Sequence, residues 1–230
     1  MHIAKDTESA SWIADRLHPF AQDVGSIIPE GFAAYARVFH PPLRTATDGT
    51  MIPVRWKDIA AANNRTVEAE VQLFCRNGGR DPSQFSATDE LLWHQQSGTG
   101  NLPREIAERF ARILPSHTGT PELCWFAVWE GYPEVRIRWG DAPSFEVPQR
   151  NLLLLYGAVS DVLTTLSISY WSYRSPTLWW PDDRSWFVAT EIDFQWSYVG
   201  GSSACIEEIL SDPELEALPT TAESGNCMEK

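Results

Sequence analysis

The clearest pattern of hydrophobic and polar positions in the chain is helical and covers residues 103–114. Apolar side chains recur there at the three- and four-residue spacing of one helix face, at Ile106, Phe110, Ile113 and Leu114. On the other face, Glu105 and Arg109 are four residues apart, as are Glu108 and Arg112, a spacing that suits ion pairs between successive turns. The pattern predicts a helix with one buried face and one charged face.

Further helices are predicted from weaker signals. A helix is expected to begin at Ser202 or Ser203, because serine is a favoured N-cap residue. The run from Ser211 to Glu214 has the spacing of a capping box and predicts one or two more helical turns, through residue 218. Shorter helical patterns cover residues 8–17, 57–63 and 159–166.

Aromatic and β-branched residues predict strands, most of them in the second half of the chain. The predicted strands cover residues 32–39, 123–130, 135–139, 151–156, 186–193 and 196–199. The link of residues 131–133 is short enough for a hairpin, which favours antiparallel pairing. Together the elements predict an α+β fold in a single domain, with a mostly antiparallel sheet and helices packed on one face. This domain is expected to cover residues 1–218, followed by a disordered acidic tail over residues 219–230.

Charge narrows the possible partners. The 230 residues include 31 Asp and Glu against 18 Lys and Arg, a formal net charge of −13. A chain this acidic does not suit counterion release from a phosphate backbone, so a nucleic-acid partner is not expected. Seven of the acidic residues lie beyond residue 200, against a single basic residue, Lys230. A negative field of this kind speeds the capture of a cationic partner.

Cysteine usage and the first residues bear on the location of the protein. The four cysteines form no C-x-x-C pair, which is typical of free thiols in a reducing compartment. The chain opens without a basic segment leading into an apolar one, so no secretory signal is expected. The apolar run over residues 151–173 contains Asp161 and predicts a buried strand followed by a core helix rather than a membrane span. We therefore expect a cytoplasmic protein that does not bind membranes.

The most aromatic part of the chain contains the candidate binding residues. Tryptophan is more frequent in this protein than phenylalanine or tyrosine, 11 against 10 and 6. Trp179 and Trp180 precede three charged residues, Asp182, Asp183 and Arg184. Large rigid aromatic side chains beside charges are typical of binding surfaces. The alternative is that the tryptophans belong to the core and that Asp183 and Arg184 form a local ion pair.

Five runs of the sequence stand out as a set. They read YARVFHP from residue 35, CWFAVWEG from residue 124, SPTLWWPDDRSW from residue 175, ATEID from residue 189 and YVGGS from residue 198. In these runs the chain resembles a family of uncharacterised bacterial proteins, over nearly its whole length. That family has no established activity, so the resemblance implies common ancestry and no mechanism.

Glu191 and Asp193 are the candidate acidic pair. They lie two residues apart in a predicted strand, so their side chains are expected on one face, with Cα atoms about 7 Å apart. Two carboxylates at that distance could divide acid and base roles or bind a hard cation. The alternative is that both face solvent or pair with Arg136 and Arg138 on a neighbouring predicted strand.

Residues 200–203, Gly-Gly-Ser-Ser, and the cysteine that follows are a further candidate. Glycines between a strand and a helix let backbone N–H groups approach a phosphate, whereas the alternative is a tight turn with a serine N-cap. Cys205 could act as a nucleophile with His117 as its base, whereas nearby Glu207 and Glu208 favour an inert thiol. The histidines show no metal-ligand spacing, so we predict neither a metal nor a cofactor.

These features predict a non-enzymatic cytoplasmic protein that binds a macromolecular partner through an acidic, tryptophan-bearing surface. The partner is expected to be a basic protein, captured as immunity proteins capture toxins. The predicted binding residues are Trp179, Trp180, Asp182, Asp183, Arg184, Glu191 and Asp193. No catalytic residue is predicted. Two alternatives stay open, an enzyme with a carboxylate-containing pocket and a module that binds a small molecule or phosphate.

Overall fold

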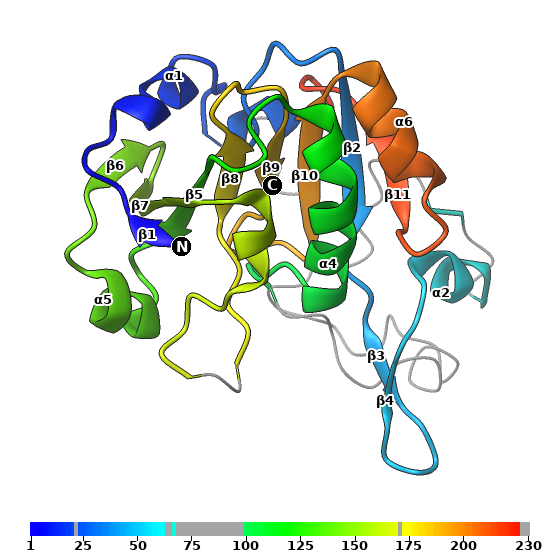
Figure 1. Ribbon diagram of the computed structural model, residues 1–230. Helices are drawn as coiled ribbons and strands as arrows, with labels where there is room; N and C mark the ends of the chain where they lie inside the picture. Colours follow the sequence, from blue (N-terminus) through cyan, green and yellow to red (C-terminus); the bar gives the residue numbers. More distant parts are fainter. Residues whose placement is uncertain (21–22, 63–65, 68–98, 170–171, 226–230) are drawn as a thin grey trace.

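An antiparallel β-sheet forms the centre of the molecule (Figure 1). The computed structural model describes residues 1–20, 23–62, 66–67, 99–169 and 172–225. In these residues the strands follow the order β1-β7-β5-β8-β9-β10-β2-β11, and β6 also pairs with β7. Each neighbouring pair is antiparallel. The strands are β1 (His2–Ile3), β2 (Ala34–Phe39), β5 (Cys124–Trp129), β6 (Ser144–Val147), β7 (Arg150–Gly157), β8 (Leu178–Pro181), β9 (Phe187–Ala189), β10 (Trp196–Gly201) and β11 (Ala217–Thr220).

Helices and a small separate sheet complete the fold. The α-helices are α1 (Ser11–Ala14), α2 (Trp56–Ala62), α4 (Arg104–Ile113), α5 (Pro133–Trp139) and α6 (Ser203–Ser211). Short 3-10 helices cover Glu8–Ala10, Val24–Ser26, Leu114–His117 and Val159–Leu163. The second sheet pairs β3 (Leu43–Thr45) with β4 (Met51–Pro53), and we call these two strands and their turn the arm. In Figure 1 the arm extends beyond the main sheet, below α2 and α4. The whole confirms the predicted α+β class.

Apolar side chains cover both faces of the main sheet. On one face, α4 and α6 pack against the central strands through Phe110, Ile206 and Ile209. On the other face, Trp12 of α1 and Trp56 of α2 belong to a second buried cluster. The helices α4 and α6 thus share one face, and the N-terminal segment and α2 cover the opposite one. Because both faces are covered, the central strands are apolar on both sides.

One predicted strand is wrong, because residues 135–139 belong to helix α5. Pro133 occupies the first turn of α5, where its missing N–H removes no helical hydrogen bond. Val135 is fully buried, whereas Ile137 is 72% exposed. An apolar run this short has no periodicity that separates a strand from a helix. The predicted hairpin at residues 131–133 is therefore wrong as well, since β5 pairs with β7 and β8.

The predicted disordered tail is wrong for the part of it that the structure describes. Ala217–Thr220 form β11, which pairs with β2, so the predicted helical turns through residue 218 are not formed. Ala222 is buried, and its carbonyl accepts a hydrogen bond from the Gly25 N–H at 2.8 Å. The residues that pair with this segment, in β2 and at Gly25, are far from it in the sequence. No local pattern therefore indicated that the segment is ordered. Residues 226–230 lie outside the described residues.

Candidate functional site

Trp179 and Trp180, which were predicted to lie on a binding surface, are fully buried. They are neighbours in β8, so their side chains point to opposite faces of the sheet. The Trp179 ring packs edge-on against Trp186, with centroids 5.1 Å apart. The Trp180 ring stacks on Phe187 at 5.5 Å. Neither indole is exposed to solvent, so neither can contact a partner, and the alternative that both belong to the core is correct.

Asp183 is held by its own neighbourhood rather than by Arg184. Its carboxylate accepts hydrogen bonds from the Gly119 N–H at 2.7 Å, the Thr118 hydroxyl at 2.9 Å and the Ser185 N–H at 3.1 Å. Burial by itself raises the pKa of Asp183, but the hydrogen bonds outweigh it and bring the pKa below its usual value. Asp183 therefore ties the loop before β5 to the loop after β8.

Asp182 and Arg184 lie on the same loop and are exposed. Asp182 accepts a hydrogen bond from the Trp125 indole N–H at 2.9 Å. Arg184 has a left-handed backbone with φ of 56°, and its guanidinium carbon lies 5.2 Å from the Trp12 ring. This is a cation–π contact. The loop is charged and exposed as predicted, but the buried tryptophans of β8 do not join these charges at the surface.

Glu191 and Asp193 do come together, although not on a strand. β9 ends at Ala189, and the two acidic residues lie in the turn that follows. The Arg150 Nη2 atom donates to Glu191 Oε1 at 2.9 Å and to Asp193 Oδ2 at 3.2 Å. Burial raises the pKa of Glu191, although the Asp193 N–H and the Arg150 charge oppose this rise. An arginine does pair with both acids, but it comes from β7 rather than from residues 135–139.

The cavity beside this ion-paired turn is small. Its volume is about 40 Å³, and its walls include the apolar side chains of Leu17, Phe20 and Leu178. A volume of that size holds water but no substrate. The geometry therefore favours a structural ion pair that fixes the turn after β9 against β7, rather than an acid and a base facing a substrate.

Replacing Arg150 with methionine is expected to lower the free energy of unfolding by about 2 kcal/mol near pH 7, because the largely buried Glu191 carboxylate loses its counter-charge. The already raised pKa of Glu191 should rise further. The loss should therefore shrink as the pH falls through that pKa and the carboxyl group becomes neutral. Urea unfolding at about pH 5 and about pH 8 measures this difference. Adding Glu191→Gln should recover most of the stability, and a double variant as unstable as Arg150→Met would contradict the account.

Cys205 is not activated as a nucleophile. The thiol is buried, and burial together with the negative charge of Glu208 raises its pKa to about 12. His117, its proposed base, instead pairs with Glu208, with 2.7 Å between Nε2 and Oε2. The alternative of an inert buried thiol is therefore the one that the geometry supports.

The Gly-Gly-Ser-Ser segment forms no separate turn, because Gly200 and Gly201 end β10, Ser202 caps α6 and Ser203 begins that helix. A Cβ atom added at Gly200 would lie 2.6 Å from the Phe32 ring, so packing itself requires the glycine. The Ser202 hydroxyl accepts a hydrogen bond from the Cys205 N–H at 3.2 Å and caps α6. This cap confirms the predicted start of the helix, whereas the tight turn is not formed, and the packed link from β10 to α6 argues against a phosphate site.

A chain of buried polar side chains links the ends of β2, β10 and β9. His40 Nε2 lies 2.9 Å from the Ser197 hydroxyl, which lies 2.6 Å from the Thr190 hydroxyl. All three side chains are fully buried. Burial lowers the pKa of His40 to about 3, so the imidazole is neutral near pH 7. Because no solvent reaches these groups, we assign them a structural role.

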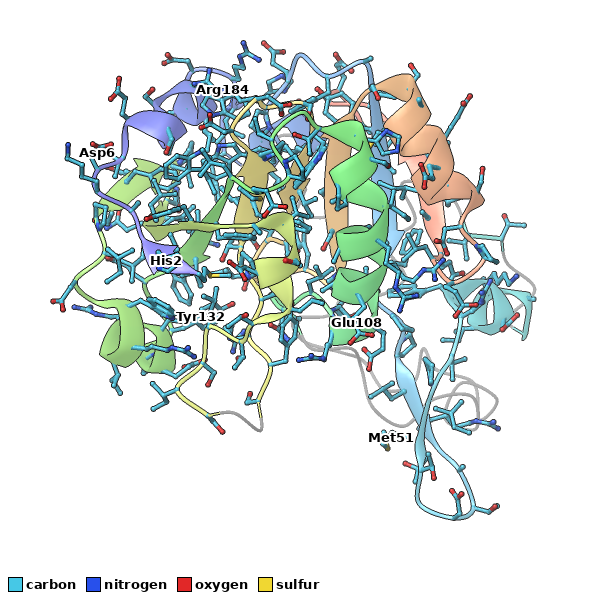
Figure 2. The ribbon with its side chains drawn as sticks, viewed as in Figure 1. His2, Asp6, Met51, Glu108, Tyr132 and Arg184 are labelled. Atoms are coloured by element: carbon cyan, nitrogen blue, oxygen red, sulfur yellow. The ribbon has the colours of Figure 1, made fainter. Side chains whose placement is uncertain are left out.

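A cleft of about 760 Å³ lies between α4, the arm and the loop that joins α6 to β11. Known ligand sites span about 300–1,000 Å³, so this volume is sufficient for binding. Figure 2 labels one residue on each side of it, Glu108 on α4 and Met51 on the arm. We call it the arm cleft.

Helix α4 lines the arm cleft along almost its whole length. Its lining positions extend from Pro103 to Arg112, about 14 Å along the helix axis. Glu105 and Glu108 lie in the N-terminal half of this wall, and Arg109 and Arg112 lie in the C-terminal half. The wall therefore changes from acidic to basic along the helix.

The remaining surface of the arm cleft is largely apolar. Phe39 and Ile106, both buried, contribute to its floor. Leu43, Met51 and Pro53 line it from the arm. The Met51 side chain is 39% exposed. The cleft thus combines an apolar floor with charged groups, a combination that ligand sites share.

The loop between α6 and β11 fixes the far side of the arm cleft. Asp212 forms an ion pair with Arg109 of α4. The Glu216 carboxylate accepts hydrogen bonds from the Trp56 and Lys57 N–H groups at the start of α2, at 2.7 and 2.6 Å. Burial raises the pKa of Glu216, although these hydrogen bonds oppose the rise. The loop therefore holds both α2 and α4 in place around the cleft.

Sequence reasoning found the charged helix of this site but not the site. The i,i+4 spacing predicted the wrong partners on α4, since Arg109 pairs with Asp212 and Glu108 pairs with Arg104 at 3.3 Å. The sequence did contain one signal for the site. Glu105 and Arg112 lie seven residues apart, so they share a face of the helix and place opposite charges along it.

In the described ranges, no three or more His, Cys, Asp or Glu side chains are grouped so that they could hold a metal ion. Within the same ranges we find no helix with the length and apolar character needed to cross a membrane. No protein-family model matches the chain, and neither a curated protein nor a solved structure proves similar to it, so the resemblance to a bacterial family stays a prediction.

Proposed function

We propose that the protein binds a basic protein partner and that a segment of this partner enters the arm cleft. The observation that carries the proposal is the cleft itself, which is large, apolar at its floor and charged along α4. The exposed Met51 side chain adds an adaptable apolar surface of the kind that binding sites use. The binding residues of the proposal thus lie on α4 and the arm instead of β8.

The charge around the arm cleft supports a basic partner. Residues 201–225 contain six acidic residues and no Lys or Arg. Glu207 and Glu208 of α6 are exposed, close in sequence to the loop that borders the cleft. A negative field of this kind speeds the encounter with a cationic protein, and salt weakens it. Capture of a basic protein, as immunity proteins capture toxins, is the function that this charge suits.

The alternative functions have less support. The carboxylates of Glu191 and Asp193 are bound to one arginine beside a cavity of about 40 Å³, which argues against an acid–base enzyme at that place. A cytoplasmic location belongs to the proposal as well. It is supported by Cys124 and Cys205, which are free thiols in the described residues.

Replacing Met51 with arginine is expected to abolish capture of the partner, because the longer, charged side chain takes up part of the cleft and replaces apolar surface that the segment would contact. The test immobilises the protein, exposes it to lysate of its native cell at low and at high salt, and identifies the retained proteins by mass spectrometry. The proposal expects a basic protein that the unmodified chain retains at low salt and releases at high salt. The Met51→Arg variant should not retain that protein.

Ile52→Arg is the matched control. Ile52 follows Met51 in β4, is 37% exposed and points to the opposite face of the arm. The substitution adds the same charge to the same strand without entering the cleft, so the partner should still be retained. If both variants retain the partner, or if both lose it, the arm cleft is not its site. If the unmodified chain retains no basic protein, the proposed function is wrong.

A further inference from the structure

We infer that the segment bound in the arm cleft carries one basic and one acidic side chain, which face opposite ends of α4. The inference rests on the proposed function and specifies what the partner must present. It follows from the order of charges along the wall of the cleft, acidic near the start of α4 and basic near its end.

Two of the four charged residues on this wall are already engaged. Glu108 and Arg109, in the middle of α4, form ion pairs with residues that do not line the cleft. Glu105 and Arg112 are exposed, line the cleft and form no ion pair within the described residues. On the α4 wall, the charges left for a ligand are therefore a carboxylate at one end and a guanidinium at the other, and across the cleft Glu214 adds a further exposed carboxylate.

The spacing of these two charges sets the spacing in the ligand. Glu105 and Arg112 are seven residues apart on α4, about 10 Å along the helix axis. An extended polypeptide rises about 3.3 Å per residue and places every second side chain on one face. A basic and an acidic side chain two to four residues apart on an extended segment can therefore reach both charges.

The shape of the arm cleft favours a polypeptide over a compact small molecule. The cleft follows α4 for about 14 Å, and its apolar floor includes the buried side chains of Phe39 and Ile106. A linear chain fills such a groove continuously, with an apolar side chain on Phe39 and Ile106 and a charged one at each end. A small dipolar molecule has to leave either the floor or one of the charges without a partner.

The test uses three pools of N-acetylated, C-amidated peptides that are random except at two positions four residues apart. These positions are Lys and Glu in the first pool, Lys and Lys in the second, and Glu and Glu in the third. Binding is measured by fluorescence polarisation at near-physiological salt, where long-range attraction to the net charge is screened. The unmodified protein should bind the Lys/Glu pool about fivefold more tightly than either other pool.

Single charge reversals should change the preference in opposite directions. Arg112→Glu makes both ends of the wall acidic, so the Lys/Lys pool should become the tightest. Glu105→Arg makes both ends basic, so the Glu/Glu pool should become the tightest. Arg136→Glu reverses the charge of an exposed residue on α5, away from the arm cleft, and should leave the original order unchanged.

The outcomes separate this inference from the proposed function. Three results would overturn the inference. The unmodified protein could bind all pools weakly, it could bind the Lys/Lys pool most tightly, or the order of the pools could stay the same in both charge-reversal variants. The free dipeptide Lys-Glu is measured as well, and binding as tight as that of the Lys/Glu pool would mean that the occupant is a small molecule. The proposed function is judged independently, by the comparison of Met51→Arg with Ile52→Arg in lysate.

Discussion

Replacing Trp180 with alanine is expected to lower the free energy of unfolding by about 3–5 kcal/mol, because it removes a large buried ring from a closely packed core. The Trp180 indole stacks on Phe187 at 5.5 Å, and the edges of Trp12 and Phe145 pack against it at 6.3 and 6.5 Å. These neighbouring rings belong to different elements, the sheet and the N-terminal segment. We therefore expect that they do not move together to close the cavity left by the substitution. Urea unfolding followed by circular dichroism measures the loss.

Trp125→Ala provides the matched control for this prediction. Trp125 lies directly opposite Trp180 in the pairing of β5 with β8, but its side chain is only partly buried. Removing it should cost about 1–2 kcal/mol. If Trp180→Ala is no more destabilising than Trp125→Ala, then Trp180 is not a core residue, and a role for it at a binding surface returns.

The second large effect expected is a loss of stability in acid caused by His40. Its pKa is about 3 in the folded chain, against 6.5 as the ordinary value that the unfolded chain recovers. As the pH falls below 6.5, His40 binds a proton in the unfolded state but not in the folded state, so the free energy of unfolding falls. Between about pH 7 and about pH 4.5, this residue should remove about 2–3 kcal/mol.

His40→Gln isolates this contribution, because glutamine keeps a polar group near Ser197 but does not titrate. Urea unfolding of both proteins across this pH range should show a smaller fall for the variant. The variant has to be compared with the unmodified protein because Glu191 and Glu216 change the stability in the opposite direction as the pH falls. Their raised pKa values destabilise the fold as the pH rises through them. Equal slopes for the two proteins, or an imidazolium signal for His40 by NMR near pH 5, would refute the assignment.

The sequence predicted the class of the fold and its longest helices because those signals are local. A regular apolar spacing identified α4, and a serine N-cap identified α6. The error at residues 135–139 has a local cause too, since five residues are too few to show a period. β11 was missed for a different reason. Its strand character comes from pairing with β2, whose residues lie far away in the sequence.

Composition alone does not decide whether an aromatic residue lies in the core or on a binding surface, as the candidate site shows. The aromatic run around Trp179 and Trp180 was wrongly assigned to a binding surface, because a single sequence does not show whether both faces of a strand are covered. The arm cleft could not be predicted either. It requires the arm to stand beside α4 and beside the loop that contains Glu216, and no local pattern encodes the distance between such segments.

The position of β2 in the sheet also dictates when this molecule can become functional during its synthesis. β2 is made early, from residues Ala34–Phe39, yet it pairs only with β10 and β11 among the described strands. At about 5–20 residues per second, a ribosome needs roughly eight to thirty seconds to make the chain between β2 and β10. The walls of the arm cleft are divided in the same way between early and late segments. A chain interrupted before β10 therefore lacks part of the wall of the cleft, and its β2 exposes unpaired backbone groups that favour aggregation.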